Sequence, residues 1–256
     1  MLFDFLQQNP LFLLISFGIG FLAGLVKGTV GFAMPMILLS GLSILMPAKQ
    51  ALAALILPTL FTNIIQSSTR GTTKLILIMK RHNFFLIISG GFLIVSSQLT
   101  PYLPTEIFMA GIGFMICFFS LFRLLGTTIK LEKGNHKLIF GVAALTGFLG
   151  GMSGIWGPLT IVYLSTLNLP KEEHIKVQGV VYTLGSLLLF VSHIKSGVFT
   201  LYSLPFSASL VLPALMGLLL GKSIRNNLNE KIFQQITLIV LLIAGLNLIR
   251  KAYFSS

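Results

Sequence analysis

The chain has 256 residues, of which 55% are hydrophobic and 9% are charged, whereas about one quarter of the residues of a soluble domain are charged. This composition excludes a water-soluble globular protein. The formal charge of +12 comes from basic residues that stand singly or in small groups between apolar runs. This distribution predicts loop charges that set the orientation of a membrane protein. It does not predict a nucleic-acid-binding surface.

Ten apolar segments follow one another, and most are about as long as the roughly 20 residues that a helix needs to cross hydrocarbon. They lie near residues 10–26, 30–46, 51–68, 84–99, 105–125, 138–152, 156–168, 175–194, 202–221 and 232–250. We therefore predict an all-α fold, a polytopic membrane helical bundle with about 8–10 transmembrane segments.

A glycine-rich break, Gly24–Pro35, separates the first two segments and contains Lys27 and Thr29. A half-helix that restarts after a break presents N–H groups and a partial charge of about +0.5, which suits an anion. Lys27 would add a full positive charge and Thr29 a hydroxyl donor. The alternative interpretation is that the glycines serve close helix packing and that Lys27 extends to an interface.

A second break, Gly150–Pro158, follows the sixth segment and offers the Ser153 hydroxyl and the Trp156 indole N–H as donors. The string GFLAG at 20–24 recurs as GFLGG at 147–151, and twelve residues separate the prolines of each of two pairs, Pro35 with Pro47 and Pro158 with Pro170. The recurrence predicts an N-terminal repeat (1–125), a cytoplasmic linker (126–137) and a C-terminal repeat (138–256), and it favours a site over simple packing.

The distribution of charge favours hairpins over long broken spans for the first two segments of each half. As hairpins, they leave 14 of the 18 lysines and arginines, Lys27 included, on the inner face. The four on the outer face are Lys49, Lys195, Arg250 and Lys251. Each half then has a hairpin and three spans, the second half is inverted, and segments 138–152 and 156–168 stop near the middle of the membrane.

Several polar residues lie inside apolar runs, and we take Gln178 among them as a further candidate for substrate binding, with interhelical hydrogen bonding as the alternative. The six carboxylates fall in tails, loops or segment ends. We therefore expect no proton or sodium relay, but export of an anion down the membrane potential. The four histidines are dispersed and show no metal-ligand spacing, so we expect no enzyme activity, no metal and no cofactor.

The second break, GFLGGMSGIWGPLTIVYLSTLNLP (Gly147–Pro170), resembles the signature of the sulfite exporter TauE/SafE family of membrane permeases. The first, GFLAGLVKGTVGFAMPMILLSGLSILMP (Gly20–Pro47), resembles the family's other copy. The resemblance implies a two-repeat bundle that moves sulfur-containing or organic anions. It also implies a site lined by Gly28, Thr29, Gly31, Gly151, Ser153, Gly154 and Trp156. The first copy departs from the glycine triplet of many members at Gly31-Phe32-Ala33, and Trp156 stands where glycine is common.

We therefore expect a multi-pass permease of the bacterial inner membrane that exports a small anion such as sulfite, sulfoacetate or a related sulfonate. An anion channel and an uptake permease for another organic anion remain as alternatives. The expected partners are this anion and the lipid bilayer, and a homo-oligomer is possible.

Overall fold

The computed structural model describes residues 9–68, 72–126, 135–167, 171–225 and 230–254. Within these ranges it contains helices and no strands, which confirms the all-α prediction. The first half contributes α2 (Pro10–Val30), α3 (Met34–Leu45), α4 (Ala48–Ser68), α5 (Thr72–Arg81), α6 (Asn83–Leu99), the 3₁₀ helix η1 (Thr100–Tyr102) and α7 (Thr105–Leu124). The second half contributes α8 (His136–Ser153), α9 (Gly157–Thr166), α10 (Lys171–Ser196), α11 (Leu204–Ser209), α12 (Val211–Ile224) and α13 (Glu230–Phe254).

In the described part of the chain, 7 helical stretches are long and apolar enough to cross a membrane. They are α2, α4, α6, α7, α10, α11 with α12, and α13. The apolar helix α3 has 12 residues and is too short to span. All ten apolar segments of the sequence coincide with helices, so the prediction of a polytopic membrane bundle is confirmed.

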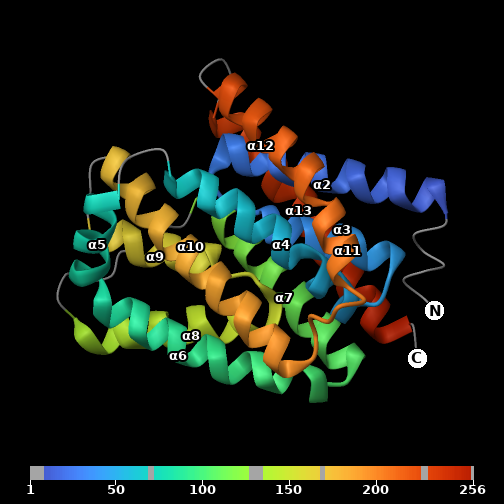
Figure 1. Cartoon of the computed structure of the whole chain (residues 1–256), viewed down its shortest axis with the longest axis horizontal. Coiled ribbons are helices and arrows are strands. Elements are labelled where there is room, and N and C mark those ends of the chain that lie inside the picture. Colours follow the sequence, from blue (N-terminus) through green and yellow to red (C-terminus); the bar gives the residue numbers. More distant parts are fainter. Residues whose placement is uncertain (1–8, 69–71, 127–134, 168–170, 226–229, 255–256) are drawn as a thin grey trace.

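The helices pack as pairs. If each helix is replaced by its counterpart in the other half, the same pairs result. In chain order α2 corresponds to α8, α4 to α10, α6 to α12 and α7 to α13. The closest pairs are α2 with α12, its counterpart α8 with α6, and α7 with α13. Figure 1 shows the α2–α12 pair and the α6–α8 pair on opposite sides of the bundle, with α4 and α10 between them.

Glycines allow the backbones of the paired helices to approach closely. A Cβ added at Gly24 would lie 2.0 Å from the carbonyl oxygen of Ala214 in α12. A Cβ added at Gly147 would lie 2.0 Å from the carbonyl oxygen of Ser89 in α6. Each glycine is one of a pair four residues apart, which is the spacing that lets membrane helices pack backbone to backbone. The packing interpretation is therefore correct for these glycines.

The hairpins α2–α3 and α8–α9 begin and turn in similar ways. Asn9 and Asn135 cap α2 and α8 with their side-chain oxygens, which accept from backbone N–H groups of the first turn. Both helices end at a glycine with positive φ, Gly31 (φ 88°) and Gly154 (φ 73°). In Figure 1 the first hairpin opens toward the right-hand end of the bundle and the second toward the left-hand end. The two turns therefore approach each other from opposite ends.

The breaks are shorter than the sequence predicted. α2 continues through Lys27 to Val30, so the non-helical stretch of the first hairpin is 31–33, and that of the second is 154–156. α8 has 18 residues, which gives a length of about 27 Å where about 20 Å was expected. The prediction that α8 stops near the middle of the membrane is therefore not supported by its length. The helix persists because hydrogen bonds from Gly31 and Gly154 to the carbonyls of Lys27 and Gly150 close its last turn.

Pro58 interrupts the central helix α4, and α11 supplies the missing bonds. A proline has no N–H, so the carbonyl of Ala54 lacks its usual helical donor. The hydroxyl of Ser207 donates to this carbonyl oxygen at 2.9 Å and accepts from the N–H of Leu57 at 3.2 Å. Ser207 therefore ties α11 to α4 at the proline.

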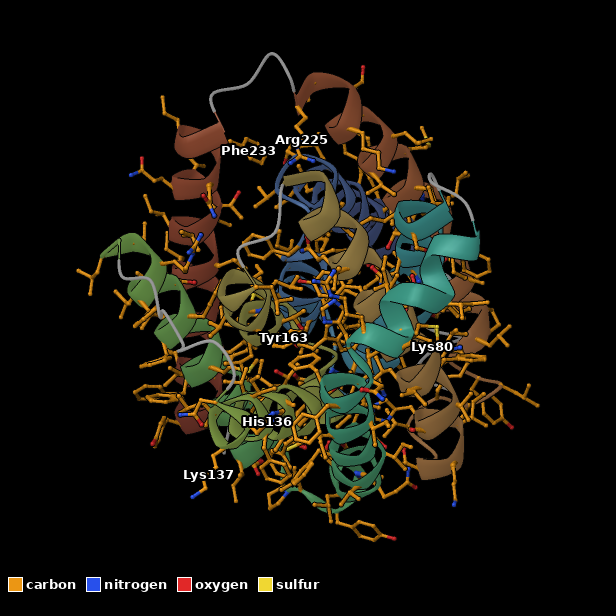
Figure 2. The ribbon with its side chains drawn as sticks, turned by 90° about the vertical axis from the view of Figure 1, so that its left-hand side faces the viewer. Lys80, His136, Lys137, Tyr163, Arg225 and Phe233 are labelled. Atoms are coloured by element: carbon orange, nitrogen blue, oxygen red, sulfur yellow. The ribbon has the colours of Figure 1, made fainter. Side chains whose placement is uncertain are left out.

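The helix α5 was not predicted, because its five apolar residues are flanked by Lys74, Lys80 and Arg81, and so short a run resembles part of a charged loop. At its end His82, expected in an inner loop, is buried and its Nδ1 lies 2.7 Å from the hydroxyl of Tyr163 in α9. Figure 2 looks onto this end of the bundle, where Lys80, His136, Lys137 and Arg225 are labelled. Basic residues therefore gather at the end toward which the second hairpin opens.

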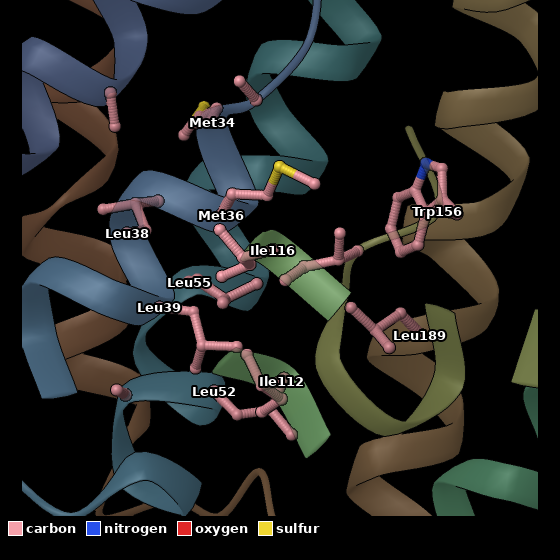
Figure 3. Close-up of a cluster of buried hydrophobic side chains, with 14 of the residues drawn as sticks. Met34, Met36, Leu38, Leu39, Leu52, Leu55, Ile112, Ile116, Trp156 and Leu189 are labelled. Carbon is pink, nitrogen blue, oxygen red and sulfur yellow. The ribbon is translucent and has the colours of Figure 1, made fainter. Parts of the chain in front are cut away.

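The apolar core lies between α3, α4 and α7 (Figure 3). Its fully buried side chains include Met34, Met36, Leu52, Leu55 and Ile116. Near the opposite end, Lys251 of α13 donates to the carbonyl oxygens of Ser43 and Ile44 in α3. The first hairpin is thus hydrogen-bonded to α13 at its open end, and its second helix, α3, packs in the core.

Candidate functional site

A small cavity lies where the two breaks meet at the centre of the bundle. Its volume is about 20 Å³, which is room for about one water molecule. It is formed by the two breaks, by the first turns of α3 and α9, and by α2, α4 and α10. It is lined by Lys27, Phe32, Ala33, Pro35, Met36, Thr59, Asn63, Ile155, Trp156, Gly157, Pro158 and Tyr182.

Several residues that line this cavity are 123 positions apart in the sequence. Pro35 and Pro158 are such a pair, and they share this separation with Pro47 and Pro170. The same spacing relates three more pairs of lining residues: Phe32 and Ile155, Ala33 and Trp156, and Thr59 and Tyr182. The other four lining residues, Lys27, Met36, Asn63 and Gly157, have no such partner in the lining. Eight of the twelve lining residues therefore form pairs with the same spacing as the prolines, and Lys27 adds a charge outside these pairs.

Lys27 brings this charge into the interior. Its side chain is 3% exposed, and its Nζ donates to Thr62 Oγ1 at 2.9 Å and to Asn63 Oδ1. Asn63 is held in turn by its amide, which donates to the carbonyl oxygen of Tyr182 at 3.0 Å. The charge distribution predicted that Lys27 lies on the inner face of the membrane, but the structure places its side chain inside the bundle.

The ammonium of Lys27 has no counter-ion among the residues that the structure describes. Both of its partners are neutral side-chain oxygens, and it lines the cavity. An ammonium has three N–H donors, so one remains for a ligand after these two bonds. A buried charge is costly unless it is paired, and an anion in the cavity would supply the missing partner.

Thr59 places an unused hydroxyl in the same cavity. Its side chain is 1% exposed, and its Oγ1 has no hydrogen-bond partner among the described residues. Buried polar atoms are nearly always hydrogen-bonded, so this exception indicates a position where a ligand or water binds. Sequence reasoning missed Thr59, although the proline register that pairs it with Tyr182 is a signal that could have found it.

The first turns of α3 and α9 also face the cavity. Pro35, Met36, Gly157 and Pro158 lie in these turns and line it. The N–H groups in the first turn of a helix lack intrahelical partners and carry partial positive charge, and in α3 and α9 no side-chain cap occupies them. Two helix N-termini and one ammonium therefore give the cavity a positive potential.

Ala33, just before α3, has φ 74°, and it is the one non-glycine residue with positive φ in the described ranges. This left-handed conformation favours glycine, and a non-glycine residue there costs about 1–2 kcal/mol. The departure from the family's glycine triplet therefore falls on a strained position. Strain of this kind is typical of ligand-binding sites.

A chain of hydrogen bonds beside the cavity connects the two breaks. Gln178 Nε2 donates to the carbonyl oxygen of Gly31 at 3.3 Å and to the hydroxyl of Tyr182 at 3.1 Å. The Tyr182 hydroxyl donates to the carbonyl oxygen of Gly157 at 3.3 Å. Gln178 itself does not line the cavity. The structure therefore places it next to the site, where it holds the first break.

The other predicted site residues lie around the cavity but do not line it. Gly28 and Gly151 face α12 and α6, where an added Cβ would come within 2.4 Å and 2.2 Å of backbone oxygens. The hydroxyls of Thr29 and Ser153 donate to carbonyls of their own helices. The structure thus brings Lys27 and Trp156 together, with Gly31 and Gln178 beside them. Gly154 shapes the turn through its positive φ.

No group of three or more histidine, cysteine or carboxylate residues that could hold a metal ion occurs in the described ranges. The one cysteine, Cys117, is buried in α7 and is not part of the cavity. What the site offers is therefore donors and positive charge, which fit the reversible binding of an anion.

Comparison with known proteins identifies the family of the chain. A model of the family described as "Sulfite exporter TauE/SafE" matches residues 16–248, nearly the whole chain, including both breaks and every residue that lines the cavity. No curated protein and no solved structure matches the chain significantly. With its seven apolar helices, the chain belongs to the sulfite exporter TauE/SafE family and is a multi-pass membrane transport protein.

Proposed function

We propose that the chain is a permease that exports a small sulfur-containing anion, such as sulfite or a small sulfonate, across the bacterial inner membrane. The observation that carries this proposal is the buried ammonium of Lys27, which lines a central cavity and has no carboxylate partner in the described residues. The Thr59 hydroxyl and the two helix N-termini add donors around the same space.

We propose alternating access between two inverted halves as the mechanism. The helix pairing, which is unchanged when the halves are exchanged, and the hairpins that approach from opposite ends support it. The cavity has room for about one water molecule, which is less than a sulfur oxyanion needs. This conformation therefore corresponds to a closed state, and substrate enters when one side of the bundle opens.

The membrane potential is the proposed driving force. A carboxylate relay for protons or sodium is not found near the cavity, whose lining contains no acidic residue. Movement of one negative charge out of a cell is favoured by about 2.3 kcal/mol per 100 mV of inside-negative potential. Export of an anion therefore needs no coupling ion.

The test is flux of radiolabelled sulfite through proteoliposomes with an imposed potassium diffusion potential. We expect transport that saturates with sulfite, follows the potential, and continues without a sodium or proton gradient. Flux that requires such a gradient would refute the driving force, and flux that does not saturate would indicate a channel. Absence of flux for sulfite and for small sulfonates would refute the function.

Binding has an internal reporter, since Trp156 is the single tryptophan of the chain and lines the cavity. Titration of the purified protein with sulfite should change the emission of this indole in a saturable way. A chloride titration at equal ionic strength is the control.

A further inference from the structure

A second and larger space lies directly behind Trp156. It has a volume of about 170 Å³ and is formed by α6, α8 and α10. Trp156 is the one residue that lines both this space, which we call the chamber, and the small cavity at Lys27. The indole therefore stands between a site for an anion and the chamber.

Apart from the indole N–H of Trp156, the side chains that line the chamber offer no free hydrogen-bond donor to an anion. The two hydroxyl groups in its lining, those of Ser89 and Thr146, donate to carbonyls of their own helices at 2.7 Å and 2.6 Å. The remaining lining is glycine and apolar side chains, among them Leu93, Val181 and Leu188. A dry apolar cavity of about 150 Å³ is large enough to bind benzene. The chamber therefore matches a compact hydrocarbon group in size and chemistry.

The indole is held in a slot between two glycines. A Cβ added at Gly150 would lie 3.2 Å from the Trp156 side chain, and a Cβ added at Gly185 would lie 3.4 Å from it. Trp156 is 5% exposed, yet none of the described residues accepts a hydrogen bond from its N–H. Buried tryptophans usually have such a partner, so this donor is available to a ligand at the junction.

We propose that Trp156 is the residue that determines the size of the transported anion. The indole closes the cavity against the chamber, so the wild-type site accepts sulfite or a sulfonate with a small organic group and excludes a sulfonate with a bulky hydrocarbon group. When the indole is removed, the chamber joins the cavity and the site accepts a sulfonate whose hydrocarbon group fills it. This inference rests on the proposed function of the Lys27 cavity.

The experiment compares uptake of sulfite and of benzenesulfonate in proteoliposomes. The variants are Trp156→Ala, Trp156→Phe, Val181→Phe and the double variant Trp156→Ala with Val181→Phe. Val181 lines the chamber and not the cavity, so a phenylalanine there reduces the chamber alone. Trp156→Leu is the second truncation in case Trp156→Ala does not give a monodisperse protein.

We expect the wild type to carry sulfite and to exclude benzenesulfonate. Trp156→Ala should raise the ratio of benzenesulfonate to sulfite flux at least about tenfold, as expected when a pocket gains room for a hydrocarbon group. Val181→Phe should cancel this gain in the double variant and leave sulfite flux unchanged on its own. Trp156→Phe, which keeps an aromatic ring, should still exclude benzenesulfonate.

The outcomes separate this inference from the proposed function. Wild-type flux of benzenesulfonate equal to that of sulfite would overturn the inference, as would an unchanged ratio in folded Trp156→Ala or Trp156→Leu. A gain that Val181→Phe does not cancel would also overturn it, because the chamber would not be the space in use. If no protein, the wild type included, carries either anion, the proposed function fails and the inference falls with it.

Discussion

The hydroxyl of Ser207 in α11 lies 2.9 Å from the carbonyl oxygen of Ala54 in α4, the acceptor that Pro58 deprives of its helical donor. The same hydroxyl accepts from the N–H of Leu57. One side chain therefore serves two backbone groups in the interior of the bundle. Hydrogen bonds of this kind contribute about 0.6 kcal/mol on average in membrane proteins, and up to about 1.7 kcal/mol.

We predict that Ser207→Ala lowers the free energy of unfolding by about 1–2 kcal/mol, because it leaves a buried donor and a buried acceptor unpaired. Unfolding in mixed detergent micelles measures the change. Ser209→Ala is the control, since the Ser209 hydroxyl donates to a carbonyl of its own helix. The cost should shrink in a Pro58→Ala background, where residue 58 regains an N–H for Ala54. An equal cost in both backgrounds would contradict the role of the proline.

Lys27→Met should weaken sulfite binding at least about thirtyfold, the equivalent of about 2 kcal/mol for the loss of a buried charge that pairs with a ligand. The Trp156 emission titration measures the affinity. Lys80→Met is the matched control, because Lys80 is exposed at the end of α5. Unchanged affinity in folded Lys27→Met would refute the anion site.

Thr59→Val should lower the affinity for sulfite without lowering the free energy of unfolding. Valine keeps the shape of threonine and removes a buried hydroxyl that has no partner, so the free energy of unfolding should not fall. Sulfite affinity should fall about tenfold, since a hydrogen bond to a charged group contributes about 1.5 kcal/mol. Thr160→Val, whose hydroxyl donates to the carbonyl of Trp156, should leave the affinity unchanged. Lower stability with full affinity in Thr59→Val would contradict the assignment.

Gly24→Ala should destabilise the bundle by at least about 2 kcal/mol, because a methyl group there forces α2 and α12 apart. Its Cβ would lie 2.0 Å from the Ala214 carbonyl oxygen. Gly18→Ala lies on the same helix with nothing within 4 Å of the added Cβ, so its stability should stay the same or rise slightly. Thermal unfolding followed by circular dichroism compares the two. Equal effects would show that α2 and α12 do not depend on this contact.

Hydropathy and the repeated strings predicted the helices and the meeting of two breaks, because span length and glycine content determine both. The number of unwound residues was not predictable. It depends on whether Gly31 and Gly154 adopt positive φ and close the preceding turns, which composition does not reveal. The helix α5 was missed because ten residues give too short a periodic pattern to distinguish from a charged loop.

Within the candidate site, the sequence identified residues by their side-chain chemistry. The structure shows which of their hydroxyl groups are already hydrogen-bonded within their own helix. Thr29 and Ser153 have the right chemistry, but on a helix their hydroxyls bond to the preceding turn. Thr59 sits on a helix as well, and its hydroxyl has no such bond. This difference lies in side-chain rotamers, and tertiary packing decides them.

The hydrogen bonds from Gln178 and Tyr182 to the carbonyls of Gly31 and Gly157 let a single helix, α10, hold both hairpin turns. Each is a bond between neutral groups, which contributes about 1 kcal/mol. Together these hydrogen bonds therefore hold the two turns with only a few times the thermal energy. In the proposed transport cycle, an anion in the cavity competes for the Tyr182 hydroxyl, which lines it, so that binding of the anion and release of the turn at Gly157 become one event.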